Sequence, residues 1–186
     1  MDQLLSLDYY LFRLINQGMS NVFFDFLMPI LRNKTTWYPL YILSAIVLVS
    51  KWKWQGLYLI LFAILSLALS DLISSQVLKN LFARTRPCLL VELSTTINLL
   101  LDKCSGAYSF PSSHAANHFA LASFFAYSFR KHALRFVLLF WASAICFAQV
   151  YVGVHFPSDV LFGALLGLSF GYLVYKIKKA VIKTAF

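Results

Sequence analysis

His155 and Asp159 are the residues in this sequence whose spacing most directly indicates chemistry. They stand four residues apart, with Pro157 between them, just before an apolar run that begins at Val160. Proline is favoured in the first turn of a helix, so a helix is predicted to begin near Pro157 with His155 at its mouth. Asp159 could then accept a hydrogen bond from one imidazole nitrogen, which fixes the tautomer and frees the other nitrogen for chemistry. The competing interpretation is a histidine and an aspartate that cap a membrane helix at the water interface.

A second polar cluster, Pro111-Ser112-Ser113-His114, also stands directly before an apolar run. Proline and serine in this place predict a helix N-terminus. Free backbone N–H groups and serine hydroxyls at a helix N-terminus form a site for an anion. His114 lies at the rim of this site as a candidate acid, whereas His118, one turn deeper, is interpreted as a hydrogen-bonded neighbour.

The third cluster runs from Lys79 to Pro87 and holds three cations, Lys79, Arg84 and Arg86. Cations at a membrane boundary can extend towards lipid phosphates, which is one interpretation of this segment. The other is a phosphate-binding site, because arginine is a planar, two-pronged donor that matches phosphate oxygens.

Together the three clusters predict phosphoryl transfer through a histidine nitrogen. Cations and helix N–H groups would hold the phosphoryl oxygens and stabilise charge in the transition state. His155 would attack phosphorus and form a phosphohistidine, while Asp159 stabilises the charge on the ring. His114 would protonate the leaving oxygen and then help to activate water for the second step.

The composition predicts an integral membrane protein that can hold these clusters at a bilayer surface. Of the 186 residues, 60% are hydrophobic and 12% are charged, against roughly half and a quarter in soluble domains. The formal net charge of +9 does not indicate a nucleic-acid partner, because the basic residues lie at the ends of apolar segments. One domain over residues 1–186 is expected, with the lipid bilayer as its surroundings and no obligate protein partner.

The apolar runs predict an all-α polytopic membrane bundle of five to six transmembrane helices. The expected spans are residues 37–50, 55–82, 114–129, 133–151 and 158–175, with a polar active-site loop at 83–113. Within an N-terminal segment of residues 1–36, residues 2–19 predict an amphipathic interfacial helix. Residues 22–31 form either a second interfacial helix or half of a span that breaks near residues 32–36, and the sequence leaves both open.

Alternating spans bring the three polar clusters to one membrane face. The opposite face collects basic residues and neither Asp nor Glu: Lys51, Lys53, Arg130, Lys131, Arg135, Lys176, Lys178, Lys179 and Lys183. By the positive-inside rule this basic face is cytoplasmic, so the clusters face outward. In a bacterium they would lie at the periplasmic or exterior side of the inner membrane, and in a eukaryote they would face a lumen.

The three clusters resemble the signature of the type 2 phosphatidic acid phosphatase superfamily, the membrane lipid phosphate phosphatases. That signature is K-x6-RP, PSGH and SR-x5-H-x3-D. The first part is matched in full, and the second has Ser113 in place of glycine. In the third part His155 and Asp159 are correctly spaced, but Ala148 and Gln149 stand where the pattern has serine and arginine. The short chain is similar to the bacterial members.

The resemblance implies a phosphatase that needs no metal and no cofactor, with His155 as nucleophile, His114 as acid and Asp159 as the residue that orients the nucleophile. It implies that phosphate is held by Lys79, Arg86, Ser112 and the backbone N–H of Ser113. Gln149 can donate hydrogen bonds to phosphate, but it lacks the charge-assisted fork of arginine. Arg84 is the candidate to supply the missing cation; without one, phosphate affinity or rate should fall, or activity should be lost.

The expected substrate is an amphiphilic phosphate ester or diphosphate whose head group enters the outward pocket while its chains stay in the bilayer. Undecaprenyl diphosphate, lipid A phosphate, phosphatidylglycerol phosphate and phosphatidic acid are candidates, and a periplasmic site favours the first two. Two other classes remain open. One is a lipid-to-lipid phosphotransferase, and the other is a catalytically silent lipid-binding homologue, which only Gln149 supports.

Two cysteines and one acidic residue outside the three clusters are also candidates for pairing. Cys88 and Cys104 share the polar loop, where a disulfide would suit an oxidising compartment, although the sequence does not give their geometry. Asp71 lies inside an expected span, where a charge is usually paired, so a partner on a neighbouring helix is predicted.

Overall fold

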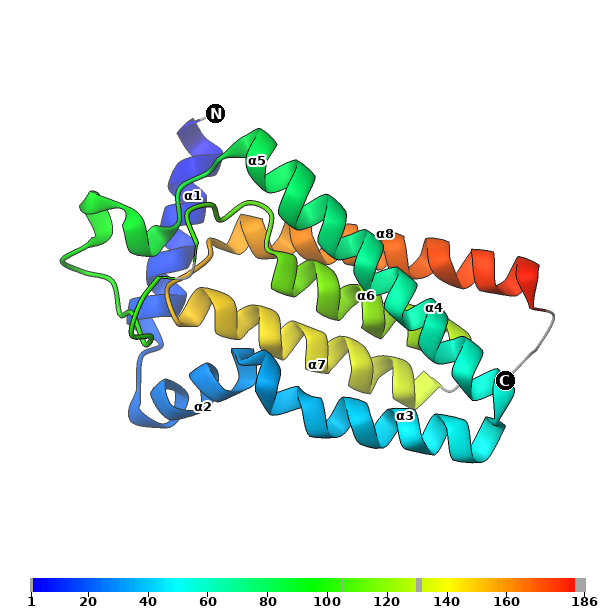
Figure 1. Ribbon diagram of the computed structural model, residues 1–186. Coiled ribbons are helices and arrows are strands. Elements are labelled where there is room, and N and C mark those ends of the chain that lie inside the picture. Colours follow the sequence, from blue (N-terminus) through cyan, green and yellow to red (C-terminus); the bar gives the residue numbers. More distant parts are fainter. Residues whose placement is uncertain (1, 105, 130–131, 183–186) are drawn as a thin grey trace.

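The long helices lie side by side and form an elongated bundle (Figure 1). The computed structural model describes residues 2–104, 106–129 and 132–182. The bundle helices are α3 (Tyr38–Trp52), α4 (Trp54–Asp71), α6 (Ser113–Ser128), α7 (His132–Tyr151) and α8 (Pro157–Val181). A π-helical stretch, Leu72–Leu78, joins α4 to α5 (Lys79–Phe82), so one continuous helix runs from Trp54 to Phe82. The described residues contain no strand, and the all-α prediction is confirmed.

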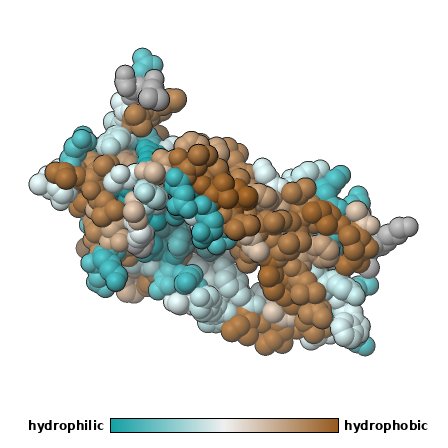
Figure 2. Space-filling model, turned by 45° about the horizontal axis from the view of Figure 1, so that its top comes forward, coloured by the Kyte–Doolittle hydropathy of each residue, from teal (hydrophilic) through white to brown (hydrophobic). Residues whose placement is uncertain are grey.

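Three of these helices are long and apolar enough to cross a membrane: Trp54–Phe82, α7 and α8. The other two, α3 and α6, have 15 and 16 residues and are about 22 and 24 Å long. Large apolar side chains are exposed along the outer faces, among them Ile64, Phe140 and Leu165. Figure 2 shows this apolar surface along the bundle, with a hydrophilic patch towards the α1 end. A bilayer solvates such a surface, and the chain is an integral membrane protein.

Helices α6 and α8 pack together through a stripe of glycines on α8. The stripe consists of Gly163, Gly167 and Gly171. A Cβ added at these positions would collide with backbone carbonyl oxygens of α6, those of Ser112, Ala116 and Ala120. Small residues let helix backbones approach closely in a membrane, where close packing replaces the hydrophobic driving force. The stripe therefore holds the start of α6, with the Pro111–His114 cluster, against the start of α8.

The N-terminal segment closes one end of the bundle. Helix α1 (Asp2–Arg13) and a π-helical turn, Leu14–Gly18, cross that end (Figure 1). The predicted helix in this segment is confirmed, but it is more than an interfacial helix, because Asp8, Phe12 and Asn16 are buried. The Asn16 amide donates to the carbonyl oxygens of Asn98 and Tyr151, at 2.8 and 2.7 Å.

Helix α2 (Val22–Arg32) packs beside α7 and is followed by a 3-10 turn, Lys34–Trp37, that leads into α3. Its 11 residues span about 16 Å, which is too short to cross a bilayer alone. The helix ends at Arg32 and a 3-10 turn separates it from α3, an arrangement that fits both interpretations of residues 22–31.

The loop that follows α5 is tied to the bundle at several points. It contains two 3-10 turns, Pro87–Leu89 and Val91–Leu93, and a disulfide joins Cys88 to Cys104. The Ser109 N–H donates to the Arg84 carbonyl oxygen at 2.7 Å. These links hold the loop beside the ends of α6 and α8.

The far end of the bundle carries the α3–α4 turn, the start of α7 and the end of α8 (Figure 1). These segments contain the basic residues Lys51, Lys53, Arg135, Lys176, Lys178 and Lys179. Their predicted grouping, away from the polar clusters, is confirmed. Arg130, Lys131 and Lys183 lie outside the described residues.

Candidate active site

His155 is buried in the short connection between α7 and α8, beside Asp159 in the first turn of α8. Its Nδ1 lies 3.5 Å from Asp159 Oδ2, which also accepts the Phe156 N–H at 2.8 Å and so caps the helix. The separation from Nδ1 is longer than an ordinary hydrogen bond, so this contact is chiefly electrostatic. The predicted placement of the imidazole at the mouth of this helix is confirmed.

Arg86 fixes the tautomer of His155. Its Nη1 lies 3.3 Å from His155 Nε2 and donates to the Val154 carbonyl oxygen at 3.1 Å. A guanidinium has no acceptor, so we assign the Nε2 lone pair as the acceptor and place the ring proton on Nδ1, facing Asp159. Burial lowers the pKa of His155 to about 4; Asp159 opposes this, and the charges of Arg86 and Lys79 reinforce it. The ring is therefore neutral near pH 7, with a lone pair on Nε2.

The Pro111–His114 cluster forms the N-terminus of α6, as predicted. The Ser112 hydroxyl accepts the Ala115 N–H at 3.4 Å, and its own N–H donates to the Asp159 carbonyl oxygen at 3.0 Å. The hydroxyl of Ser113 is buried and makes no hydrogen bond within the described part of the chain. The serine that replaces the expected glycine thus carries a hydroxyl that remains available to a ligand. The Ser112 hydroxyl accepts the cap bond and still has its own hydrogen to donate.

Arg84 is paired with carboxylates and is not placed beside Gln149. Its Nη1 lies 2.6 Å from Asp159 Oδ1, and its Nη2 lies 2.6 Å from Asp8 Oδ2 in α1. The guanidinium also stacks on the Phe156 ring, 4.1 Å from its centroid. Arg84 therefore binds the carboxylate of Asp159. This differs from the phosphate-binding role expected from the sequence. Asp8 was not among the site residues expected from the sequence. The signal that could have indicated its role is that it is an acidic residue on the apolar side of a short helix.

Gln149 is fully buried near the end of α7. Its Oε1 accepts a hydrogen bond from Arg32 Nε at 3.3 Å, and its Nε2 makes no hydrogen bond within the described ranges. Arg32 is the last residue of α2 and was not singled out from the sequence. A basic residue at the end of a short helix has an ordinary local explanation, so no sequence signal distinguished it.

His118 and Asp71 have the hydrogen-bond partners expected of them. His118 Nδ1 lies 2.7 Å from the His114 carbonyl oxygen, and its Nε2 lies 3.4 Å from the Tyr41 hydroxyl, as expected of a hydrogen-bonded neighbour. Asn117 of α6 donates to Asp71 Oδ1 at 2.8 Å, which confirms a partner on a neighbouring helix. Among the residues that the structure covers, no three His, Cys, Asp or Glu side chains are grouped as metal ligands.

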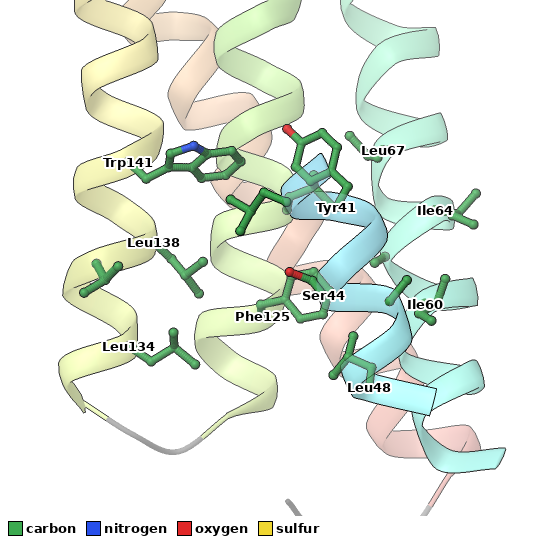
Figure 3. Close-up of a pocket in the computed structure, with 15 residues that line it drawn as sticks. Tyr41, Ser44, Leu48, Ile60, Ile64, Leu67, Phe125, Leu134, Leu138 and Trp141 are labelled. Atoms are coloured by element: carbon green, nitrogen blue, oxygen red, sulfur yellow. The ribbon is translucent and has the colours of Figure 1, made fainter. Parts of the chain in front are cut away.

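An apolar cavity of about 510 Å³ lies between α3, α4, α6 and α7. Tyr41 and Trp141 lie at one end of it, and Leu48 and Leu134 towards the other (Figure 3). Tyr41 and Trp141 also contact His118. The Tyr41 hydroxyl lies 3.4 Å from His118 Nε2, and the Trp141 ring lies edge-on to the imidazole with a centroid separation of 5.1 Å. The cavity therefore leads from the histidines of α6 towards the far end of the bundle.

A buried histidine between an arginine and an aspartate, at one end of a membrane helix bundle, is the arrangement expected of a membrane phosphatase. Residues 58–183 match the PAP2 superfamily, and the chain belongs to that superfamily. It is a lipid phosphatase, as the resemblance implied.

Particular relatives agree with this assignment. The chain is 30% identical over 162 residues to a lipid A 4'-phosphatase of Bacteroides thetaiotaomicron, an alignment that covers 86% of this chain and 72% of the relative. It is 28% identical to a lipid A 4'-phosphatase of Porphyromonas gingivalis, over 95% of this chain and 75% of that protein.

Two solved structures share the fold. The crystal structure of Aquifex aeolicus LpxE has a TM-score of 0.70 and 30% identity, covering 91% of this chain and 95% of that one. A transmembrane PAP2-type phosphatidylglycerolphosphate phosphatase from Bacillus subtilis has a TM-score of 0.75 and 22% identity, covering 98% of this chain and 90% of the other.

Proposed function

We propose that this lipid phosphatase hydrolyses a phosphate monoester on lipid A through a phosphohistidine formed on His155. The observation that carries the mechanism is the position of the imidazole, with Nδ1 facing Asp159 and Nε2 facing Arg86. This arrangement supplies a nucleophilic lone pair beside a cation that can bind a phosphoryl oxygen.

In the first step His155 Nε2 attacks phosphorus, and the bond between phosphorus and the lipid oxygen breaks. His114 gives a proton to the departing oxygen, so the dephosphorylated lipid leaves as an alcohol. Lys79, Arg86, the Ser113 N–H and the Ser113 hydroxyl stabilise the charge on the transferring group. Asp159 stabilises the positive ring of the phosphohistidine, and Arg84 keeps this carboxylate in place.

In the second step water attacks the phosphohistidine. His114, now neutral, takes a proton from the water, and the phosphorus–nitrogen bond breaks. Inorganic phosphate leaves, His155 returns to its neutral form with the proton on Nδ1, and the proton taken from water leaves His114 ready to act as the acid in the next cycle.

Lipid A is the substrate that the relatives favour among the four candidates. Both bacterial relatives are described as lipid A 4'-phosphatases, and they align with most of this chain. The apolar cavity beside His118 would take an acyl chain of such a lipid while its phosphate reaches His155.

The site is proposed to face the periplasm of a bacterial inner membrane. Six basic residues lie together at the far end of the bundle, which the positive-inside rule assigns to the cytoplasm: Lys51, Lys53, Arg135, Lys176, Lys178 and Lys179. The disulfide between Cys88 and Cys104 lies at the active-site end, which suits an oxidising compartment.

The test is phosphate release by the purified protein in detergent with EDTA. Lipid A, undecaprenyl diphosphate, phosphatidylglycerol phosphate and phosphatidic acid are supplied in turn. We expect release from lipid A to exceed release from the others and to vanish in His155→Ala. His132→Ala, an exposed histidine at the far end of the bundle, is the matched control and should keep full activity.

Three results would count against parts of this proposal. Preference for another lipid would overturn the substrate, and loss of activity with EDTA would overturn the metal-independent mechanism. Appearance of phosphate on a second lipid, with none free in solution, would indicate a phosphotransferase.

A further inference from the structure

We propose that Arg32 binds the substrate phosphate in place of the motif arginine that Gln149 replaces. This inference rests on the proposed phosphatase mechanism and deepens it. It assigns a phosphate-binding role to the N-terminal segment, which lies outside the part of the chain that matches the superfamily, residues 58–183.

The first support is the contact between the two side chains. Arg32 Nε donates to Gln149 Oε1 at 3.3 Å, although the residues are 117 positions apart. This hydrogen bond places the guanidinium of Arg32 beside position 149, where the family pattern has an arginine. Neither Nη group of Arg32 makes a hydrogen bond or an ion pair within the described residues, so the two-pronged face remains available to phosphate oxygens.

The second support is an excess of buried positive charge. Arg32 and Lys79 are half-buried and Arg86 is buried, and no described carboxylate lies within ion-pair distance of any of them. Burial, and to a lesser degree the charge of Arg32, lowers the pKa of Arg86 to about 10 against the opposing charge of Asp159, so the two guanidinium groups repel one another. Buried charges without counter-charges are costly, and a phosphate dianion would relieve that cost.

The third support is a set of buried donors without acceptors. Gln149 Nε2 and Arg86 Nε both make no hydrogen bond within the described residues. Buried donors in native proteins are nearly always paired, and exceptions gather where a ligand or ion binds. Arg86 also contacts His155, so an anion shared by these donors would lie beside the nucleophile.

The position of Arg32 is also fixed by its surroundings. The Tyr151 hydroxyl donates to Asp25 Oδ1 at 2.6 Å and accepts the Asn21 N–H at 3.2 Å, which ties α2 to the end of α7. At the other end of α2, the Trp37 indole donates to the Leu31 carbonyl oxygen at 2.8 Å. A pre-positioned guanidinium loses little conformational freedom when it binds phosphate.

The experiment compares Arg32→Gln, Arg32→Lys and the exchange variant Arg32→Gln/Gln149→Arg with wild type. Lys34→Gln, which removes an exposed charge two residues away, is the matched control. We expect Arg32→Gln to lower kcat/KM for phosphate release about 10- to 100-fold, the range for a hydrogen bond to a charged group. Inhibition by inorganic phosphate should weaken by a similar factor. Arg32→Lys should retain part of the activity, the exchange variant should recover part of it, and the control should match wild type.

Orthovanadate binding, followed as a rise in the thermal midpoint, tests Arg32 without turnover. The rise should shrink in Arg32→Gln and return in the exchange variant. If wild type releases no phosphate, the proposed function fails, but this measurement still decides the role of Arg32. Normal kcat/KM in Arg32→Gln would overturn the inference. So would lost activity with unchanged phosphate inhibition and vanadate response, because that result indicates structural support only.

Discussion

Asp8 Oδ2, in the first helix, lies 2.6 Å from Nη2 of Arg84, whose other terminal nitrogen holds Asp159. Asp8 also accepts the N–H of Ser158 at 2.9 Å, so it binds both the arginine and the first turn of α8. The N-terminal helix therefore supports the carboxylate proposed to orient the nucleophile.

Asp8→Asn should weaken this support. Removing the charge leaves Arg84 with one carboxylate, so we expect stability to fall by about 1–3 kcal/mol and kcat to fall more than KM rises. Thermal midpoints in detergent and phosphate-release kinetics check both. Glu92→Gln removes an exposed acidic charge and should change neither. Equal activity of Asp8→Asn and wild type would show that α1 does not position Asp159.

His155 should remain neutral well into the acid range. Its pKa is lowered to about 4, mainly by burial, so the nitrogen should titrate far below the ordinary value of about 6.5. NMR of ¹⁵N-histidine-labelled protein measures this directly, with the His155 signal identified by its absence in His155→Gln. Because the folded pKa lies below the unfolded one, this residue's contribution to stability is present above pH 6.5 and is lost as pH falls towards 4. Titration near 6.5 would contradict the buried, neutral nucleophile.

Gly167→Leu should separate α6 from α8. A side chain here would meet the Ala116 carbonyl oxygen and the α6 backbone near Ala120, so we expect a loss of about 1–3 kcal/mol from overpacking. Activity should fall as well, since this contact sets the distance between the two helix N-termini. Ser169→Leu, exposed on the same helix, is the control for adding an apolar side chain. An unchanged thermal midpoint in Gly167→Leu would contradict the close packing.

The disulfide between Cys88 and Cys104 should stabilise the active-site loop. It closes a loop of 16 residues, for which the chain-entropy model gives about 3 kcal/mol. We expect dithiothreitol to lower the thermal midpoint of wild type and to reduce activity, because Arg86 lies two residues before Cys88. The double variant Cys88→Ser/Cys104→Ser should show the lowered values from the start and no response to reductant. A reductant effect of equal size in the double variant would show that this disulfide is not its cause.

The sequence by itself determined the chemistry-bearing residues and the helices that carry them. Apolar runs define membrane helices because lipid cannot satisfy a free backbone, and proline and serine mark where α6 and α8 begin. Both signals are local, so the ends of these helices, the position of His155 beside Asp159 and the gathering of the polar clusters at one end could all be predicted. The partner of Asp71 was expected for the same reason, since a charge inside a helix bundle needs one.

Only the tertiary structure decided which side chains meet across long stretches of chain. Arg84 and Arg86 are two residues apart and chemically identical, yet one binds two carboxylates and the other contacts the nucleophile. Asp8 and Arg32 gain their roles from contacts 76 and 117 positions away, which no local periodicity records. Side-chain pairing at such separations depends on how the helices pack, and the glycine stripe of α8 sets that packing through backbone shape. The spacing of residues along the chain could therefore locate the site, whereas only the packing of the helices shows which contacts each cation makes within it.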